Sequence, residues 1–351
     1  MRKMKNIGIV LETKADALKT GLPLDQLYHW REPGEIAAIT GAIKELGFTP
    51  IILGTPEDLA ARPASGIDFI FNLSVGFVNR YRLAAGPALY SLLKIPYSGA
   101  DPYTKMMSQH KHAMKSFWDK LGIPTPEWAY IHTPSDVRTA SLPPFPLILK
   151  PAYEGSSIGI DENSVIHSKK HLLAKAEELF SRLNMPMIVE RFIAGRECKV
   201  GIIGNDETEF SGIIEDIGPD GRGLGEEMLY FRAKKAGTYS KRTLAAGDKL
   251  SKRILKDARR IYELFRPVDY GTMDMRVDDR GRHYFLEFNA DATLHPQRTL
   301  AQCCALNGVD YRTMIGKILT ASFRRWEIRQ PLPKLKTEGV HHTGKRSRQT
   351  Q

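Results

Sequence analysis

The sequence contains few cysteines and lacks the two most common nucleotide-binding fingerprints. Among its 351 residues the only cysteines are Cys198, Cys303 and Cys304, and their spacing fits no metal-binding motif. This pattern excludes a disulfide-stabilised secreted scaffold and fits a protein of the reducing cytoplasm. Neither a GxxxxGK[ST] loop nor a GxGxxG sequence is present. The sequence therefore indicates neither a P-loop NTPase nor a dinucleotide-binding domain.

Long apolar segments are also absent. No run approaches the roughly 20 residues that a membrane-spanning helix needs. The N-terminus opens with basic residues, but the apolar run that follows, "IGIVL", is too short for a signal peptide. We interpret it as a first β-strand and expect no membrane partner.

The sequence has an excess of positive charge, but no other feature of it indicates nucleic-acid binding. The chain has 51 Lys and Arg against 40 Asp and Glu, a net charge of +11. Residues 331–351 hold five of these cations and one acid, without apolar periodicity, so we expect a basic, disordered tail over residues 326–351. Such a tail can contact nucleic acid. A solvated chain end explains it more simply, and we expect no nucleic-acid partner.

Strand and helix patterns alternate over the first hundred residues and then change. Residues 33–47 show helical apolar spacing between the strand-like runs "NIGIVL" and "IDFIFNLS". This alternation predicts a parallel sheet covered by helices. From about residue 128, short β-branched runs are joined by turns and interrupted by one helix. We therefore expect an α/β domain followed by α+β structure.

The stretch "KPAYEGSSIGI", residues 150–160, allows two interpretations. It can be a simple turn between strands, in which Gly155 and Gly159 supply backbone freedom. It can also bind an anion, because a lysine at a strand end precedes a loop of backbone N–H groups and the hydroxyls of Ser156 and Ser157. The stretch alone does not decide between them.

A hairpin near residue 280 places two carboxylates opposite each other. With a turn centred on Arg280–Gly281, Asp274 pairs with Glu287 and Thr272 pairs with Asn289. Directly opposed like charges destabilise a hairpin, and a divalent cation would offset the repulsion. Oxygen ligands that include an amide suit Mg²⁺ bound to substrate phosphates. Together with residues 150–160, this hairpin indicates an ATP site that is not a P-loop.

At this point the chain resembles the ATP-grasp superfamily and, within it, the D-alanine–D-alanine ligase-like carboxylate–amine ligases. The resemblance extends from about residue 67 to 300 and rests on stretches that occur in the family's order. These stretches are "IPYSGADP", "KHAMKSFWDKLGIPTPEW", "FPLILKPAYEGSSIGI", "MIVERFIAGRECKVGIIGN", "LYFRAKK" and "MDMRVDDRGRHYFLEFNAD". The implied fold class is α/β and α+β, an ATP-grasp fold with an N-terminal Rossmann-like domain. The implied division is a substrate-side domain (1–103), a central subdomain (104–187), a C-terminal subdomain with the metal site (188–325) and the tail (326–351).

The resemblance also implies roles for residues that would bind the ATP phosphates. Lys111, Lys150 and Lys234 would hold the phosphates, with Lys234 reaching in from a mobile loop and acting in catalysis. Ser156 and Ser157 would lie on the small loop that closes over them.

Further implied roles concern the rest of the nucleotide and the metal. Glu190 would accept a hydrogen bond from the adenine amino group, the backbone from Arg191 to Ile193 would contact the base, and Glu197 would bind the ribose. The residues expected to hold Mg²⁺, or Mn²⁺, are Asp274, Glu287 and Asn289.

The implied reaction joins a carboxylate to an amine through an acyl phosphate, converting ATP to ADP and phosphate. The expected partners are small amino-acid or carboxylate substrates, and the assembly could be a homodimer. The sequence departs from the D-alanine ligases on the substrate side. Thr272 stands where the D-alanine ligases have an arginine, and the Pro-Gly that they have after the metal-binding Asn is missing after Asn289. Arg298 stands near the position of the serine that binds the acceptor carboxylate in those enzymes, and it would take over that role. Arg80 and Arg82 add further positive charge.

These departures leave three functions open. The first is a ligase for a substrate other than D-alanine, the second a divergent D-alanine–D-alanine ligase, and the third an ATP-binding module with impaired catalysis.

Overall fold

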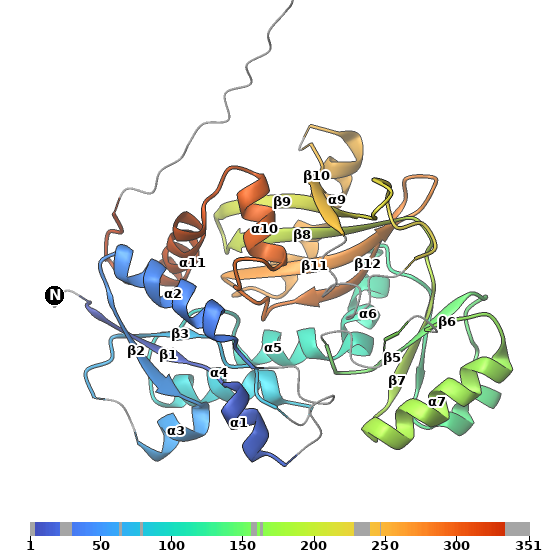
Figure 1. Ribbon diagram of the computed structural model, residues 1–351, viewed down its shortest axis with the longest axis horizontal. Coiled ribbons are helices and arrows are strands. Elements are labelled where there is room, and N and C mark those ends of the chain that lie inside the picture. The colour runs from blue at the N-terminus through green and yellow to red at the C-terminus, as the bar shows by residue number, and fades with distance from the viewer. Residues whose placement is uncertain are drawn as a thin grey trace, which may run out of the picture.

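A computed structural model describes residues 4–21, 30–62, 65–77, 80–155, 160–161, 164–227, 239–245 and 247–333 (Figure 1). The predictions for Ser156, Ser157, Lys234 and residues 334–351 of the tail lie outside these residues. The prediction of disorder is wrong for residues 326–333, because Ile328 and Leu332 pack against the core and Trp326 Nε1 donates to the carbonyl of Tyr97 over 2.8 Å. Within the described ranges, no helix combines the length and apolar character needed to cross a membrane.

The N-terminal unit is built on a three-stranded parallel sheet in the order β2-β1-β3. The side chains of β1 and β3 are almost all buried, as expected for parallel strands that are covered on both faces. The predicted α/β alternation is confirmed. The elements are β1 (Asn6–Val10), α1 (Lys14–Lys19), α2 (Pro33–Glu45), β2 (Thr49–Gly54), α3 (Pro56–Ala61), β3 (Phe69–Asn72) and α4 (Arg82–Leu92).

Two short helices connect this unit to the rest of the chain, α5 (Pro102–Gln109) and α6 (Lys111–Lys120). Residues 103–121 have the sequence pattern of one continuous helix, but the structure divides them into two. His110 adopts an extended backbone conformation and separates the two helices. The amide of Lys111 then donates to the carbonyl of Ala152, 3.0 Å away. The break therefore fixes the first turn of α6 against the loop that follows β5.

A four-stranded antiparallel sheet in the order β4-β7-β5-β6 forms the central unit. Helix α7 packs on it and completes a separate small core that includes Leu147, Leu179 and Val189. Strand β7 crosses the predicted boundary at residue 187 and belongs to this sheet. The elements are β4 (Trp128–Ile131), a 3₁₀ helix η2 (Pro134–Arg138), β5 (Leu147–Pro151), β6 (Val165–Ile166), α7 (Lys169–Leu183) and β7 (Met187–Arg191).

A five-stranded antiparallel sheet in the order β10-β9-β8-β11-β12 forms the third unit. Helix α9 packs on one face, and α10 and α11 pack on the other. Its elements are β8 (Arg196–Gly204), β9 (Thr208–Ile217), β10 (Ser240–Thr243), α9 (Lys249–Leu264), β11 (Tyr270–Val277), β12 (His283–Asn289), α10 (Thr299–Leu306) and α11 (Tyr311–Arg325).

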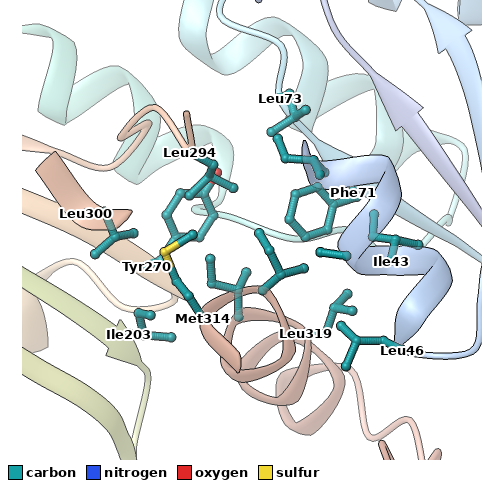
Figure 2. Close-up of a cluster of buried hydrophobic side chains, with 14 of the residues drawn as sticks. Ile43, Leu46, Phe71, Leu73, Ile203, Tyr270, Leu294, Leu300, Met314 and Leu319 are labelled. Carbon is teal, nitrogen blue, oxygen red and sulfur yellow. The ribbon is translucent and has the colours of Figure 1, made fainter. Parts of the chain in front are cut away.

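One hydrophobic core joins the N-terminal unit to the five-stranded sheet. Figure 2 shows Ile43 and Phe71 of the N-terminal unit facing Met314 and Leu319 of α11, with Tyr270 of β11 beside them. Burial of this shared apolar surface holds the two units together. The central sheet has its own core and faces the other two units across the cavity described next.

Candidate active site

A cavity lies between the central sheet and the five-stranded sheet. Its lining includes the predicted residues Lys111, Lys150, Glu190, Arg191, Ile193, Glu197, Asp274 and Glu287. The remaining lining residues are Ile148, Pro151, Glu154, Gly155, Ile160, Phe192, Arg276 and Leu286. Asn289 and Arg298 are not on this lining. One surface thus combines cationic, acidic and apolar groups contributed by both sheets.

The hairpin β11–β12 presents the two carboxylates as predicted. Asp274 pairs with Glu287, and Thr272 pairs with Asn289. The turn itself is one residue longer than predicted, because the amide of Asp278 bonds the carbonyl of Arg282 and leaves three residues, 279–281, between them. A bulge between Asp274 and Met275 adds one residue and restores the predicted register at the carboxylates. The pairing is confirmed, although the turn that we assumed is not the one that forms.

The metal-binding role of this hairpin remains a prediction. Within the described residues, no three His, Cys, Asp or Glu side chains are grouped so as to hold a metal. Of the three predicted metal ligands, only Asp274 and Glu287 belong to these residue types. The third is the side-chain amide of Asn289. The donor atoms of all three are oxygens, and the opposed carboxylates need a cation between them, so the residues fit Mg²⁺.

Two of the lysines that we predict to bind phosphate, Lys111 and Lys150, line the cavity. Lys111, at the start of α6, donates to the carbonyl of Glu154, and its Nζ lies 3.8 Å from Glu287 Oε2. Lys150, near the end of β5, donates to Glu190 Oε2 over 2.9 Å. Two cations from different elements therefore converge near the carboxylate hairpin, which suits a polyphosphate bound with a metal.

A buried cluster of charges around Glu190 supports Lys150 and was missed by the sequence analysis. The Nζ of Lys115 lies 3.4 Å from Glu190 Oε1, and neither side chain is exposed. Burial alone would raise the pKa of Glu190, but the ammonium groups of Lys115 and Lys150 outweigh it and hold the pKa below its usual value. Lys115 could have been anticipated, because it lies one helical turn after Lys111 on the same face.

This pairing bears on the predicted adenine contact. Because the Glu190 carboxylate is shared by two lysines, it would have to bind the adenine amino group in addition to them. The backbone amides of Arg191 and Phe192 already donate to the carbonyls of Glu127 and Pro146, both over 2.8 Å. The roles of Glu190 and of the segment from Arg191 to Ile193 stay predictions.

A second network surrounds Glu197 at the other end of the cavity. Its carboxylate lies 3.1 Å from the Nζ of Lys199 and 3.2 Å from Arg276 Nη1. Arg276 also donates to the carbonyl of Ile193 and stacks over the Phe192 ring. It lies two residues after Asp274 on the same strand face, so strand periodicity could have revealed it. This network fixes Glu197 at a position where a ribose could be bound.

The predicted substrate-side arginines are not on the cavity lining. Arg298 is the N-cap residue of α10 and is exposed. Arg80 is exposed as well. Arg82 is buried, donates to the carbonyl of Val75 over 2.7 Å and lies 3.2 Å from Glu154 Oε2. Arg82 therefore joins the N-terminal unit to the loop after β5.

Comparison with known proteins shows where this arrangement recurs. The family model "D-ala D-ala ligase C-terminus" matches residues 117–320. A D-alanine–D-alanine ligase from Aquifex aeolicus is 28% identical over 232 residues, which are 66% of this chain and 75% of that protein. One from Pseudomonas putida is 27% identical over 290 residues, 82% of this chain and 86% of that protein.

A solved structure shares the fold. The D-alanine–D-alanine ligase from Bacillus anthracis, crystallised with ATP, matches with a TM-score of 0.69 at 20% identity. The match covers 93% of this chain and 99% of that one. The family model covers more than half of the chain. The chain therefore belongs to the D-alanine–D-alanine ligase family of ATP-grasp enzymes, which are ATP-dependent ligases that join a carboxylate to an amine.

Proposed function

We propose that this enzyme forms an amide between two small substrates that are not both D-alanine, through an acyl phosphate and with Mg²⁺ as the metal. The observation that supports the reaction most strongly is the single cavity that brings Lys111 and Lys150 together with the opposed Asp274 and Glu287. The proposal of a different substrate is supported by the departures at Thr272 and Arg298 and by the absence of a Pro-Gly after Asn289.

In this proposal each residue type has a defined task. Lys111 and Lys150 bind phosphate oxygens and neutralise the charge that collects on the transferred phosphoryl group. Asp274, Glu287 and Asn289 hold the metal, which when bound polarises phosphate oxygens. The apolar side chains of Ile148 and Leu286, from the two facing sheets, enclose the adenine ring. Two sheets that meet over the substrate also exclude the water that would hydrolyse an acyl phosphate.

The reaction proceeds by two displacements. An oxygen of the donor carboxylate attacks the γ-phosphorus of ATP, the bond to the bridging oxygen breaks, and ADP leaves. The amine nitrogen of the acceptor then attacks the acyl carbon, phosphate leaves, and the nitrogen loses a proton. The protein contributes mainly position and charge, because neither step needs a covalent bond to the enzyme.

A product screen tests the proposal. The purified protein is incubated with ATP, MgCl₂ and pairs drawn from the D- and L-forms of alanine, serine, glutamate and lysine, with glycine. Phosphate release and product mass are measured. We expect one pair to give a product whose mass is the sum of its substrates less one water. Product from D-alanine alone would identify a divergent D-alanine–D-alanine ligase, and nucleotide binding without turnover on any pair would contradict the ligase proposal.

A further inference from the structure

The buried lysines of the described residues differ in whether their ammonium group has a partner. Five are buried, and four of these have acidic partners or hydrogen-bond acceptors within the protein. The fifth, Lys105, is 2% exposed. Its Nζ makes no hydrogen bond and no ion pair within 4 Å to any residue of the described ranges. The paired four are Lys111 with Glu154 and Glu287, Lys115 with Thr125 and Glu190, Lys175 with Asp161 and Glu178, and Lys199 with Glu197 and Asp216.

Lys105 lies on a helix whose position is fixed. Asp101 caps the N-terminus of α5 by accepting from the amide of Thr104, and the hydroxyl of Thr104 donates to the carbonyl of Phe265 over 2.6 Å. The helix also contacts β12. The missing partner is therefore not explained by a loosely placed backbone.

Charged groups from four other segments act electrostatically on Lys105. After burial, the largest influences on its pKa come from Asp291, two residues beyond Asn289, and then from Arg31, Arg82 and Glu12 of the N-terminal unit. Arg31, Arg82 and Glu12 are each less than 8% exposed. The lysine thus lies where the N-terminal unit meets the end of the carboxylate hairpin, and it is not on the lining of the nucleotide cavity.

Three of these neighbours are held by bonds to the backbone around β3. Arg31 Nε donates to the carbonyl of Leu73 over 2.8 Å. Glu12 accepts from the hydroxyl of Ser74 and from the amide of Val75. Arg82 donates to the carbonyl of the same Val75. These hydrogen bonds hold Arg31, Glu12 and Arg82 in place without a ligand.

One of these side chains also has a hydrogen-bond donor that lacks an acceptor. Arg82 Nε is buried and makes no hydrogen bond to the described residues. A buried ammonium that lacks acceptors is costly, since each Nζ offers three donors. Burial lowers the pKa of Lys105 to about 8, so the side chain still carries its charge in most molecules at neutral pH. A bound anion would supply the acceptor and the counter-charge that Lys105 lacks among the described residues.

The geometry points to Lys105 as the site that binds the carboxylate which the acceptor amine retains through the reaction. This inference rests on the proposed function. The donor carboxylate must reach the phosphates inside the cavity that Lys111 and Lys150 line, whereas Lys105 lies outside that lining. The acceptor class is therefore an amino acid or a peptide with a free carboxylate, because a neutral amine would leave the buried lysine unpaired.

The first test uses the wild-type enzyme and needs no substitution. The acceptor found in the product screen is compared with its methyl ester, which keeps the amine but loses the negative charge. We expect kcat/KM to fall by about tenfold or more for the ester, in line with one lost charge-assisted hydrogen bond. An ester used as efficiently as the free acid would overturn the inference while leaving the ligase proposal intact.

The second test compares Lys105→Met with Lys317→Met. Lys317 is a half-buried lysine of α11 that donates to the carbonyl of Glu209 and is remote from both sites. Lys105→Met should raise the acceptor KM about tenfold to hundredfold. It should not lower the melting temperature, because no contact within the protein is lost. Lys317→Met should leave the acceptor KM unchanged.

Hydroxylamine in place of the acceptor separates the two half-reactions. It attacks the acyl phosphate and releases phosphate and a hydroxamate, and it has no carboxylate to bind. Lys105→Met should form hydroxamate at the wild-type rate. An unchanged acceptor KM, or an equal fall in both activities, would overturn the inference. If the wild type gives no product with any pair, the ligase proposal fails and this inference fails with it.

Discussion

The nucleotide cavity and the substrate side of this enzyme manage buried charge in different ways. In the cavity, Lys150 and Lys115 share Glu190, and Glu197 is shared by Lys199 and Arg276. On the substrate side, Lys105 is buried without an ion-pair partner among the described residues. These cations therefore have carboxylate partners before ATP arrives, whereas Lys105 still needs a counter-charge. A binding site that lacks its counter-charge selects for the ligand that supplies it.

The two sides also differ in how they are supported. The N-terminal unit and the five-stranded sheet share one hydrophobic core (Figure 2). The central sheet has its own small core and meets the rest of the molecule across the cavity. The N-terminal unit, which carries Arg31, Arg82 and Glu12, is thus joined to the five-stranded sheet by a continuous core, whereas the cavity lies between two separate cores.

Loss of the metal carboxylate should give the largest effect. Asp274→Asn should lower phosphate release by about a thousandfold, because metal polarisation contributes several kcal/mol to such reactions. Without MgCl₂ the melting temperature of the variant should be no lower than that of the wild type, because the substitution removes the repulsion between Asp274 and Glu287. Turnover assays and thermal melts with and without MgCl₂ check both points, and retained turnover would refute the metal role.

Neutralising Glu190 should mainly affect stability. Glu190→Gln leaves Lys115 and Lys150 buried without a counter-charge, and breaking a buried pair costs about 3–5 kcal/mol. Because its folded pKa lies below the usual 4.5, Glu190 stabilises the wild type above pH 4.5, and this contribution is lost as the pH falls through the folded pKa. Urea unfolding from pH 7 to pH 3 should show a smaller acid-induced loss in the variant. Parallel curves for both proteins would contradict this assignment.

Removal of the strand-end lysine should weaken ATP binding and, more mildly, folding. Lys150→Met should raise the Kd for a non-hydrolysable ATP analogue by roughly tenfold to hundredfold, as for one charge-assisted hydrogen bond. Glu190 keeps Lys115 as a partner, so the protein should remain folded. Calorimetric titration measures the affinity, with Lys317→Met as the control. A folded variant that binds the analogue like the wild type would exclude the phosphate role.

The smallest effect is expected at Arg298. An exposed arginine is screened by water, and such ion pairs contribute about 0.2–1 kcal/mol. Arg298→Ala should therefore raise the acceptor KM by at most about fivefold, much less than Lys105→Met. The ATP constant should stay unchanged. The reverse ranking of the two variants would return the acceptor carboxylate to Arg298 and weaken the contrast between the two sides.

Local patterns predicted the parts of the fold and site that depend on neighbouring residues. Strand alternation and the paired runs around the turn predicted that Asp274 lies opposite Glu287, and the pairing is correct because the bulge offsets the difference in the turn. The apolar run that ends at Lys150 was enough to place that lysine at the end of a buried strand.

Features that arise from long-range packing were not predicted. Nothing local marks His110 as the break between α5 and α6, because the break is stabilised by the contact between Lys111 and Ala152. Lys105 resembles any other lysine in a short helix. Its burial depends on the N-terminal unit and on the segment after β12, which lie far from it in sequence.

The central claim is that a carboxylate oxygen is transferred to phosphate during amide formation. The most direct measurement uses the donor amino acid labelled with ¹⁸O in its carboxylate, with unlabelled water, and determines the mass of the phosphate released during product formation. An acyl phosphate passes one labelled oxygen to each phosphate, so the account predicts one ¹⁸O per phosphate. Phosphate without the label would mean that water cleaves ATP directly, and would contradict the assignment of this cavity to a carboxylate–amine ligase.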